Sequence, residues 1–343
     1  MGSGEEDMEE LAERAIQDQI YFCDNPKEVD RLSRKDLPRS TVEAIRNLQR
    51  LDTTYNWKIL FFFSLWALAG WIMLHNFGIA VSTLCVITMG LCVNGLPILM
   101  HDACHALLSK NSTINRWLGF ICGAPGLVSG SAYRSIHAWH HAELRSHDDP
   151  DDIENGAPKS LPLVFVYYAV LLIGIYVYLF TVIQVGYSKA GQTMKRSIIT
   201  EYLLIAGIIG TAFSLFPATA VLRVWGLPLL IAGQLSNVRG LAEHGLTTGG
   251  NPFTNARTVI SNKFVSFFMS NLNYHLEHHL FPGVPWYNLP KVHALLSDTY
   301  KRTGSSVYRG YSDFLADFFR ITFHGIIPNI RLIPDHVREE ICA

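Results

Sequence analysis

The hydrophobic residues of this chain are gathered in long stretches that carry almost no charge. Residues 59–74 and 79–100 contain no charged side chain, and only four residues separate them. Because a helix needs about 20 apolar residues to cross a bilayer, the pair has the length of two short spans. We therefore predict a tight transmembrane hairpin in this part of the chain.

Three further apolar stretches follow at residues 161–184, 198–216 and 218–235. Polar, histidine-containing segments precede and follow these stretches, and if those segments share one site the number of crossings between them must be even. We therefore expect residues 161–184 to form an interfacial or re-entrant helix. The other two stretches are then a second hairpin, which turns at Phe216 and Pro217.

Basic residues flank the open ends of the first hairpin, and its turn carries none. Arg46, Arg50 and Lys58 precede the hairpin, and Lys110 and Arg116 follow it. Loops rich in lysine and arginine stay in the cytoplasm. Both open ends are therefore predicted to face the cytoplasm.

These patterns predict an all-α, multi-pass integral membrane protein. We expect four spanning helices in two hairpins, an additional interfacial apolar helix, and a cytoplasmic helical cap. The expected division is a cytoplasmic N-terminal segment at 1–56, a membrane catalytic domain at 57–300, and a cytoplasmic C-terminal segment at 301–343.

The charge balance changes this picture little, but the histidine content changes it substantially. Lysine and arginine number 28 against 29 aspartate and glutamate residues, so nothing in the charge favours a nucleic-acid partner. Histidine occurs 14 times, and most copies fall in tight clusters. Those clusters carry the functional argument.

Three histidine clusters, called boxes one, two and three, lie next to the predicted spans. Box one reads H-D-A-C-H, box two H-A-W-H-H and box three H-L-E-H-H. On a helix, positions i, i+3 and i+4 share a face, so each box should aim its imidazoles in one direction. The eight box histidines are His101, His105, His137, His140, His141, His275, His278 and His279.

Eight clustered imidazoles predict two metal ions rather than one. Imidazole suits iron, copper, nickel and zinc, and a tetrahedral zinc site needs only four ligands. His244, just past the last apolar stretch, is a ninth candidate ligand. The remaining isolated histidines are interpreted as non-ligands: His75, His147, His293, His324 and His336.

The third box also carries a resemblance to a known family. The segment from Asn273 to Pro282, followed by two further proline dipeptides, resembles the membrane fatty acid desaturase superfamily. The match extends in order and spacing over roughly residues 55–300. The resemblance implies a mushroom-like helical fold with four spans, two iron ions, dioxygen as co-substrate and an external electron donor.

The resemblance also concerns single residues near the metal site. In the family a histidine after the fourth span completes the site, which matches His244. Some members place an asparagine four residues earlier, where this chain has Gly240. Carboxylates beside the ligands can orient the imidazole rings, and the candidates are Asp102, Glu243 and Glu277. Two aromatic residues, Trp139 and Tyr274, are candidates for shaping a substrate tunnel.

The predicted function is oxygen-dependent desaturation of a long-chain fatty acyl substrate at a di-iron site on the cytoplasmic face. Hydroxylation, ketolation or oxidative decarboxylation of an acyl or carotenoid substrate would use the same site. A histidine-rich transporter or receptor is disfavoured, because the boxes lie at the ends of the spans. The sequence has no Gly-x-Gly-x-x-Gly motif and no cysteine cluster, so we expect a separate ferredoxin, or b-type cytochrome with its reductase, as electron donor.

Overall fold

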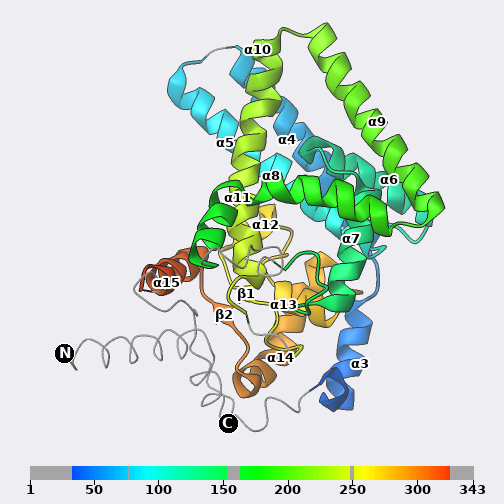
Figure 1. Cartoon of the computed structure of the whole chain (residues 1–343), viewed down its shortest axis with the longest axis vertical. Helices are drawn as coiled ribbons and strands as arrows, with labels where there is room; N and C mark the ends of the chain where they lie inside the picture. The colour runs from blue at the N-terminus through cyan, green and yellow to red at the C-terminus, as the bar shows by residue number, and fades with distance from the viewer. Residues whose placement is uncertain (1–32, 76, 153–162, 248–250, 325–343) are drawn as a thin grey trace.

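The computed structural model describes residues 33–75, 77–152, 163–247 and 251–324 (Figure 1). Within those ranges the regular secondary structure is helical apart from one pair of two-residue strands, β1 (Thr258–Val259) and β2 (Val307–Tyr308). The strands pair in parallel, with Thr258 opposite Val307. The all-helical architecture predicted from the apolar pattern is therefore confirmed.

In the part of the chain that the structure describes, five helical segments are long and apolar enough to cross a membrane, as expected for a multi-pass membrane protein. Each one covers one of the five apolar stretches identified in the sequence. The helices are α4 (Trp57–Leu74), α5 (Ile79–Cys104), α8 (Leu163–Lys189), α9 (Gln192–Leu215) and the continuous run of α10 (Ala218–Val221), η4 (Leu222–Gly226) and α11 (Leu227–His244).

The breaks between consecutive helices lie where the sequence predicts the two turns. Helix α4 ends at Leu74, and α5 begins after Gly78, whose φ of 94° suits a residue without Cβ. Helix α9 ends at Leu215, and Pro217 starts the next helix. In Figure 1, α8 instead crosses α11 and runs toward α9, while α5, α9 and α11 extend toward the top of the view. The assignment of four spans and one interfacial helix stays a prediction.

Close helix packing positions the end of α5 that carries box one. A Cβ added at Gly90 would lie 2.5 Å from the Ile231 side chain on α11, and one at Gly95 would lie 2.8 Å from Phe62 on α4. Small residues allow helix backbones to approach this closely in membrane proteins. Glycine at these two positions thus lets α5 pack between α4 and α11.

Shorter helices surround the histidine boxes. Two of them carry boxes directly, α7 (Gly130–Glu143) with box two and α13 (His275–Leu280) with box three. An apolar cluster that includes Leu276, Leu280 and Val292 packs α13 against its neighbours. The other short helices are α3 (Arg39–Leu48), α6 (Ser112–Gly123), α12 (Lys263–Phe268), α14 (Leu289–Thr303) and α15 (Tyr311–His324), with single turns η1 (Arg34–Asp36), η2 (Thr53–Asn56), η3 (Ala124–Gly126) and η5 (Trp286–Asn288).

A buried carboxylate fixes the start of the helix that carries box two. Glu201 on α9 accepts hydrogen bonds from the hydroxyls of Ser129 and Ser131 at 2.7 and 2.6 Å, and from the Ser131 backbone N–H at 2.9 Å. Ser129 is itself the N-cap of α7 and accepts from the Ala132 N–H. A negative charge at a helix N-terminus is stabilising, so Glu201 anchors α7 to α9.

Candidate metal centre

The structure brings all nine predicted ligands together, in two adjoining groups. They come from four segments that lie apart in the sequence: the C-terminal ends of α5, α7 and α11, and the short helix α13. The first group has its ring nitrogens within 4.8 Å of one another and consists of His101, His105, His137, His141 and His278. The second group contains His140, His244 and His279, which meet the same limit, together with His275.

Short contacts between Nε2 atoms define each group. In the first, His137 Nε2 lies 3.0 Å from Nε2 of both His105 and His141. In the second, His275 Nε2 lies 2.9 Å from His244 Nε2 and 3.0 Å from His279 Nε2. This convergence is the geometry that the two-metal prediction requires.

Boxes two and three each contribute to both groups. The pair at i and i+4 of box two, His137 and His141, joins the first group, and His140 at i+3 joins the second. Box three does the reverse, since His278 at i+3 joins the first group. The imidazoles of each box point toward the same site, as expected. Those of boxes two and three nevertheless divide between its two groups. The stacked rings of His141 and His279, 4.3 Å between centroids, mark the boundary between the groups.

Burial favours the neutral form of these imidazoles, which a metal ligand requires. Removal from water, reinforced by neighbouring histidines, lowers the pKa of His137, His278 and His279 well below its usual range. Burial lowers the pKa of His105 to about 4 and that of His141 to about 2. Neutral rings have a free nitrogen lone pair at neutral pH. The donor set therefore fits two imidazole-ligated metal ions.

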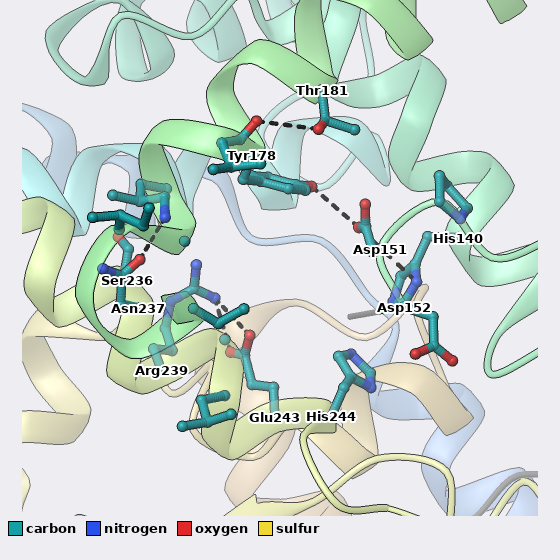
Figure 2. Close-up of a pocket in the computed structure, with 18 of the residues that line it drawn as sticks. His140, Asp151, Asp152, Tyr178, Thr181, Ser236, Asn237, Arg239, Glu243 and His244 are labelled. Atoms are coloured by element: carbon teal, nitrogen blue, oxygen red, sulfur yellow. Dashed lines mark hydrogen bonds and ion pairs between the residues drawn. The ribbon is translucent and has the colours of Figure 1, made fainter. Parts of the chain in front are cut away.

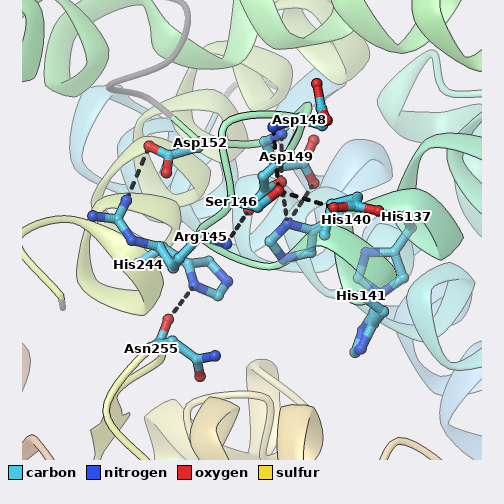
Figure 3. A network of polar contacts seen from close by, with 12 residues as sticks. His137, His140, His141, Arg145, Ser146, Asp148, Asp149, Asp152, His244 and Asn255 are labelled. Carbon is cyan, nitrogen blue, oxygen red and sulfur yellow. Dashed lines mark hydrogen bonds and ion pairs between the residues drawn. The ribbon is translucent and has the colours of Figure 1, made fainter. Parts of the chain in front are cut away.

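His140 differs from the other box histidines because carboxylates surround it. Burial alone lowers its pKa, but the hydrogen bond with Asp149 and the nearby Asp151 and Glu243 raise the pKa above its usual value overall. Asp149 Oδ1 lies 2.8 Å from His140 Nδ1 (Figure 3). This contact holds the proton on Nδ1 and leaves Nε2 directed at the second group.

Two polar groups that orient histidine rings of the second group were not predicted from the sequence. Asp149 belongs to the acidic run after box two, and the Arg145 backbone N–H donates to its other oxygen at 2.8 Å. The Asn255 carbonyl accepts from His244 Nδ1 at 3.2 Å (Figure 3). The acidic run beside a histidine box was the only available signal for Asp149. No sequence signal identified the Asn255 carbonyl.

The three carboxylates named from the sequence have different environments. Glu243 Oε1 lies 3.4 Å from His275 Nδ1, which suits an orienting role. Asp102 Oδ1 is 3.8 Å from His101 Nδ1, beyond hydrogen-bond distance, and its other oxygen accepts from the Trp286 backbone N–H. Glu277 instead contacts Thr258 and His293, so its described partners lie outside the predicted ligand set.

The isolated histidines stay outside both groups wherever their side chains are described. His147 is exposed, His75 contacts the Trp71 carbonyl, and His293 pairs with Glu277. The side chain of His324 and all of His336 lie outside the described part of the molecule.

A cavity of about 440 Å³ adjoins the histidine groups (Figure 2). It lies between α8, α11 and the loop after box two, and predicted ligands such as His140 and His244 line it. The expected tunnel aromatics Trp139 and Tyr274 do not line it; Trp139 instead contacts Lys189. Tyr133 and Tyr178 supply the aromatic walls. The site therefore combines buried imidazoles with a cavity large enough for part of a lipid chain.

An all-helical fold with five membrane-length helices, and with two histidine groups that could hold metal ions beside a cavity, is typical of a class of membrane oxidoreductases. Residues 77–311 match the family model described as fatty acid desaturase, and the chain belongs to this family. The resemblance seen in the sequence is thereby confirmed, and the protein is an oxidoreductase.

The chain is similar to family members with different named reactions. It is 26% identical to a human sphingolipid delta(4)-desaturase/C4-monooxygenase over 75% of this chain and 78% of the relative. It is 26% identical to a Bacillus subtilis fatty acid desaturase over 68% of this chain and 72% of the relative. It is 27% identical to a Chlamydomonas reinhardtii zeaxanthin 4-ketolase over 57% of this chain and 40% of the relative.

Proposed function

We propose that this chain desaturates a long-chain fatty acyl substrate with dioxygen at a di-iron centre. The observation that carries the proposal is the pair of adjoining, buried imidazole groups beside the 440 Å³ cavity. The reaction converts –CH2–CH2–, dioxygen, two electrons and two protons into –CH=CH– and two water molecules. The chain must therefore receive electrons from outside.

The nine histidines are the proposed iron ligands, divided as the two groups divide them. The first ion would be held by His101, His105, His137, His141 and His278, and the second by His140, His244, His275 and His279. Bound iron would supply the reduction of dioxygen and the oxidising power that an unactivated methylene demands.

The protein's own contribution is to orient the ligands and exclude water. Asp149 and the Asn255 carbonyl set which nitrogen of His140 and His244 carries the proton. The walls of the cavity would hold the acyl chain against the histidine groups. Small displacements of a reacting carbon change rates greatly, so these walls determine which C–H bonds react.

A four-span topology with the boxes on the cytoplasmic face is part of the proposal. It is supported by the basic residues flanking the first hairpin and by the course of α8 across α11. The electrons then come from a separate cytoplasmic ferredoxin, or b-type cytochrome with its reductase. Cysteines introduced at positions 160 and 240 should react with an impermeant reagent from the same side of the membrane. Labelling from opposite sides would refute the topology.

Desaturation is preferred over oxygen insertion because the third box resembles acyl desaturases most closely and a Bacillus subtilis relative is named as one. Other relatives are named as a desaturase/monooxygenase and a ketolase, so the choice between desaturation and oxygen insertion needs a direct test. Labelled dioxygen, reductant, electron carrier and an acyl substrate separate the outcomes. A desaturase leaves the label in water, whereas labelled alcohol or ketone as the main product would overturn desaturation.

The most informative experiment is lipid profiling of a host that expresses the chain. The expected result is new unsaturated chains in cells with the wild-type protein and none with His278→Ala. His147→Ala is the matched control, because that side chain is 98% exposed and outside both groups. Equal lipid profiles for the wild type and His278→Ala would contradict the proposed function.

A further inference from the structure

The cavity beside the histidine groups shares lining residues with a second cavity, which lies between the apolar helices. The second cavity has a volume of about 320 Å³ and lies between α5, α8 and α11. Its walls include Val93, Pro97, Leu229 and Leu230, and His101 of the first histidine group also lines it. Such a surface suits a hydrocarbon chain.

The two cavities share walls at the level of the histidine groups. Residues that line both include Tyr133, Tyr178, Ser236 and Arg239. A chain lying in the apolar cavity would therefore pass beside these side chains where it reaches the first cavity. The shared residues are mostly polar, although they lie between two largely apolar spaces.

Three side chains form a polar belt around the first cavity: Arg239 from α11, Tyr178 from α8, and Asp151 from the loop after box two. The Tyr178 hydroxyl donates to Asp151 Oδ2 at 3.1 Å. Figure 2 shows Arg239 on the opposite side of the pocket, with its guanidinium directed toward the space between them. Saturated hydrocarbon offers these groups no hydrogen bond, and polar groups that lose water without a replacement partner cost free energy.

The charges of the belt favour an uncharged ligand group. Arg239 Nη1 is paired with both carboxylate oxygens of Glu243, at 2.8 and 3.0 Å. Asp151 adds a further carboxylate on the opposite side, and Asp152 also lines the cavity. A carboxylate or phosphate would meet these acidic groups, whereas a hydroxyl or amide can both donate and accept hydrogen bonds.

We propose that the substrate carries an uncharged hydroxyl group within a few carbons of the carbon that is oxidised. Arg239, Tyr178 and Asp151 bind this group, and the hydrocarbon tail lies in the second cavity. The belt lies beside the predicted ligands, because Asp151 Oδ2 is 3.9 Å from His140 Nδ1 and Glu243 Oε1 is 3.4 Å from His275 Nδ1. Oxidation therefore takes place near the polar end of the molecule. This inference rests on the proposed function and adds the substrate class to it.

The test uses two saturated long-chain amides that differ only in a hydroxyl group near the amide. Iron-loaded wild-type protein with reductant and electron carrier should oxidise the hydroxylated amide with a kcat/KM at least about tenfold higher than that of the amide without the hydroxyl. A factor of about ten corresponds to the net contribution of one hydrogen bond. Lengthening the tail should leave the position of the new double bond unchanged when it is counted from the hydroxyl-bearing carbon. Equal kcat/KM values, or a position fixed from the methyl end, would overturn the inference while leaving the proposed function intact.

Two variants separate recognition of the polar group from a structural role. Tyr178→Phe and Arg239→Gln should reduce the kcat/KM ratio between the two amides toward one, because each removes part of the belt. A fall in both kcat/KM values by the same factor, with the ratio unchanged, would show a merely structural role and overturn the assignment. If iron-loaded wild-type protein oxidises neither amide nor a plain acyl chain, the proposed function fails and the inference falls with it.

Discussion

Asp149 Oδ1 lies 2.8 Å from His140 Nδ1, and both side chains are buried. The contact fixes the ring of the one box histidine whose pKa is raised above its usual value. We predict that Asp149→Asn weakens metal retention by about 10–100-fold, the usual effect of losing a partner that orients a metal-bound histidine. Metal content after dialysis against graded chelator concentrations measures this change.

The control for that measurement is Asp148→Asn. Asp148 belongs to the same acidic run, but its side chain is 75% exposed, and among its described contacts only His147 is a histidine. Its removal should leave metal retention unchanged. Equal chelator sensitivity of the Asp149→Asn variant and the wild type would show that Asp149 does not orient a ligand.

The buried Glu201 gives a second prediction, which concerns stability. Glu201→Gln removes the charge that accepts three hydrogen bonds at the start of α7. Hydrogen bonds to charged groups contribute about 1.5–3 kcal/mol each, so we expect a loss of about 2 kcal/mol after partial replacement by the amide. The melting temperature in detergent should fall. The same Glu-to-Gln change at exposed Glu43 should have no effect, and identical melting of the Glu201 variant and wild type would contradict the anchoring role.

Gly240 lines the first cavity, and a Cβ added there would meet no atom within 4 Å. Gly240→Leu should therefore fold, retain metal, and fill space beside the histidine groups. We predict a fall in turnover of at least about tenfold, because displaced substrate reacts slowly. Gly207→Leu on α9 is the control, since a Cβ there also meets open space. Full activity of the Gly240 variant would show that substrate does not occupy this cavity.

The low pKa values of His105 and His141 predict how the metal-free protein responds to acid. The folded-state pKa values of about 4 and about 2 lie below the ordinary value of 6.5, so the unfolded chain binds more protons below about pH 6.5. Stability is therefore fully present above that pH and is lost as the pH falls toward 4. The melting temperature of chelator-treated protein should stay level from about pH 7.5 to 6.5 and then fall steadily toward about pH 5. A melting temperature that stays constant down to about pH 5 would contradict the lowered pKa values of His105 and His141.

The helical spacing of the boxes made it predictable that the histidines of each box lie close together, but not how they divide between the two groups. Residues at i, i+3 and i+4 of a helix project to one broad face, so the shared direction of the imidazoles within one box follows from the sequence alone. Which imidazole joins which group depends on how α7 and α13 cross, and this is a tertiary property. The split of His140 from His137 and His141 could therefore be seen only in the structure.

The orienting and cavity residues were harder to predict for a similar reason. Asp149 reaches His140 because the chain turns back after α7, where Arg145 has a φ of 59°. An acidic run usually forms a solvated surface, and nothing in the spacing identifies the residue that turns inward. Likewise, Tyr178 and Arg239 meet at one cavity only because α8 crosses α11. Hydropathy reports the length of α8 but not its direction.

The metal content of the purified chain tests the central claim most directly. Nine converging histidines in two groups predict two iron ions per polypeptide, measured by elemental analysis of protein purified in detergent without added metal. The His278→Ala variant should bind less iron, because that residue belongs to the first group. Two iron ions per wild-type chain is the predicted result, and one zinc ion with no iron would contradict the account.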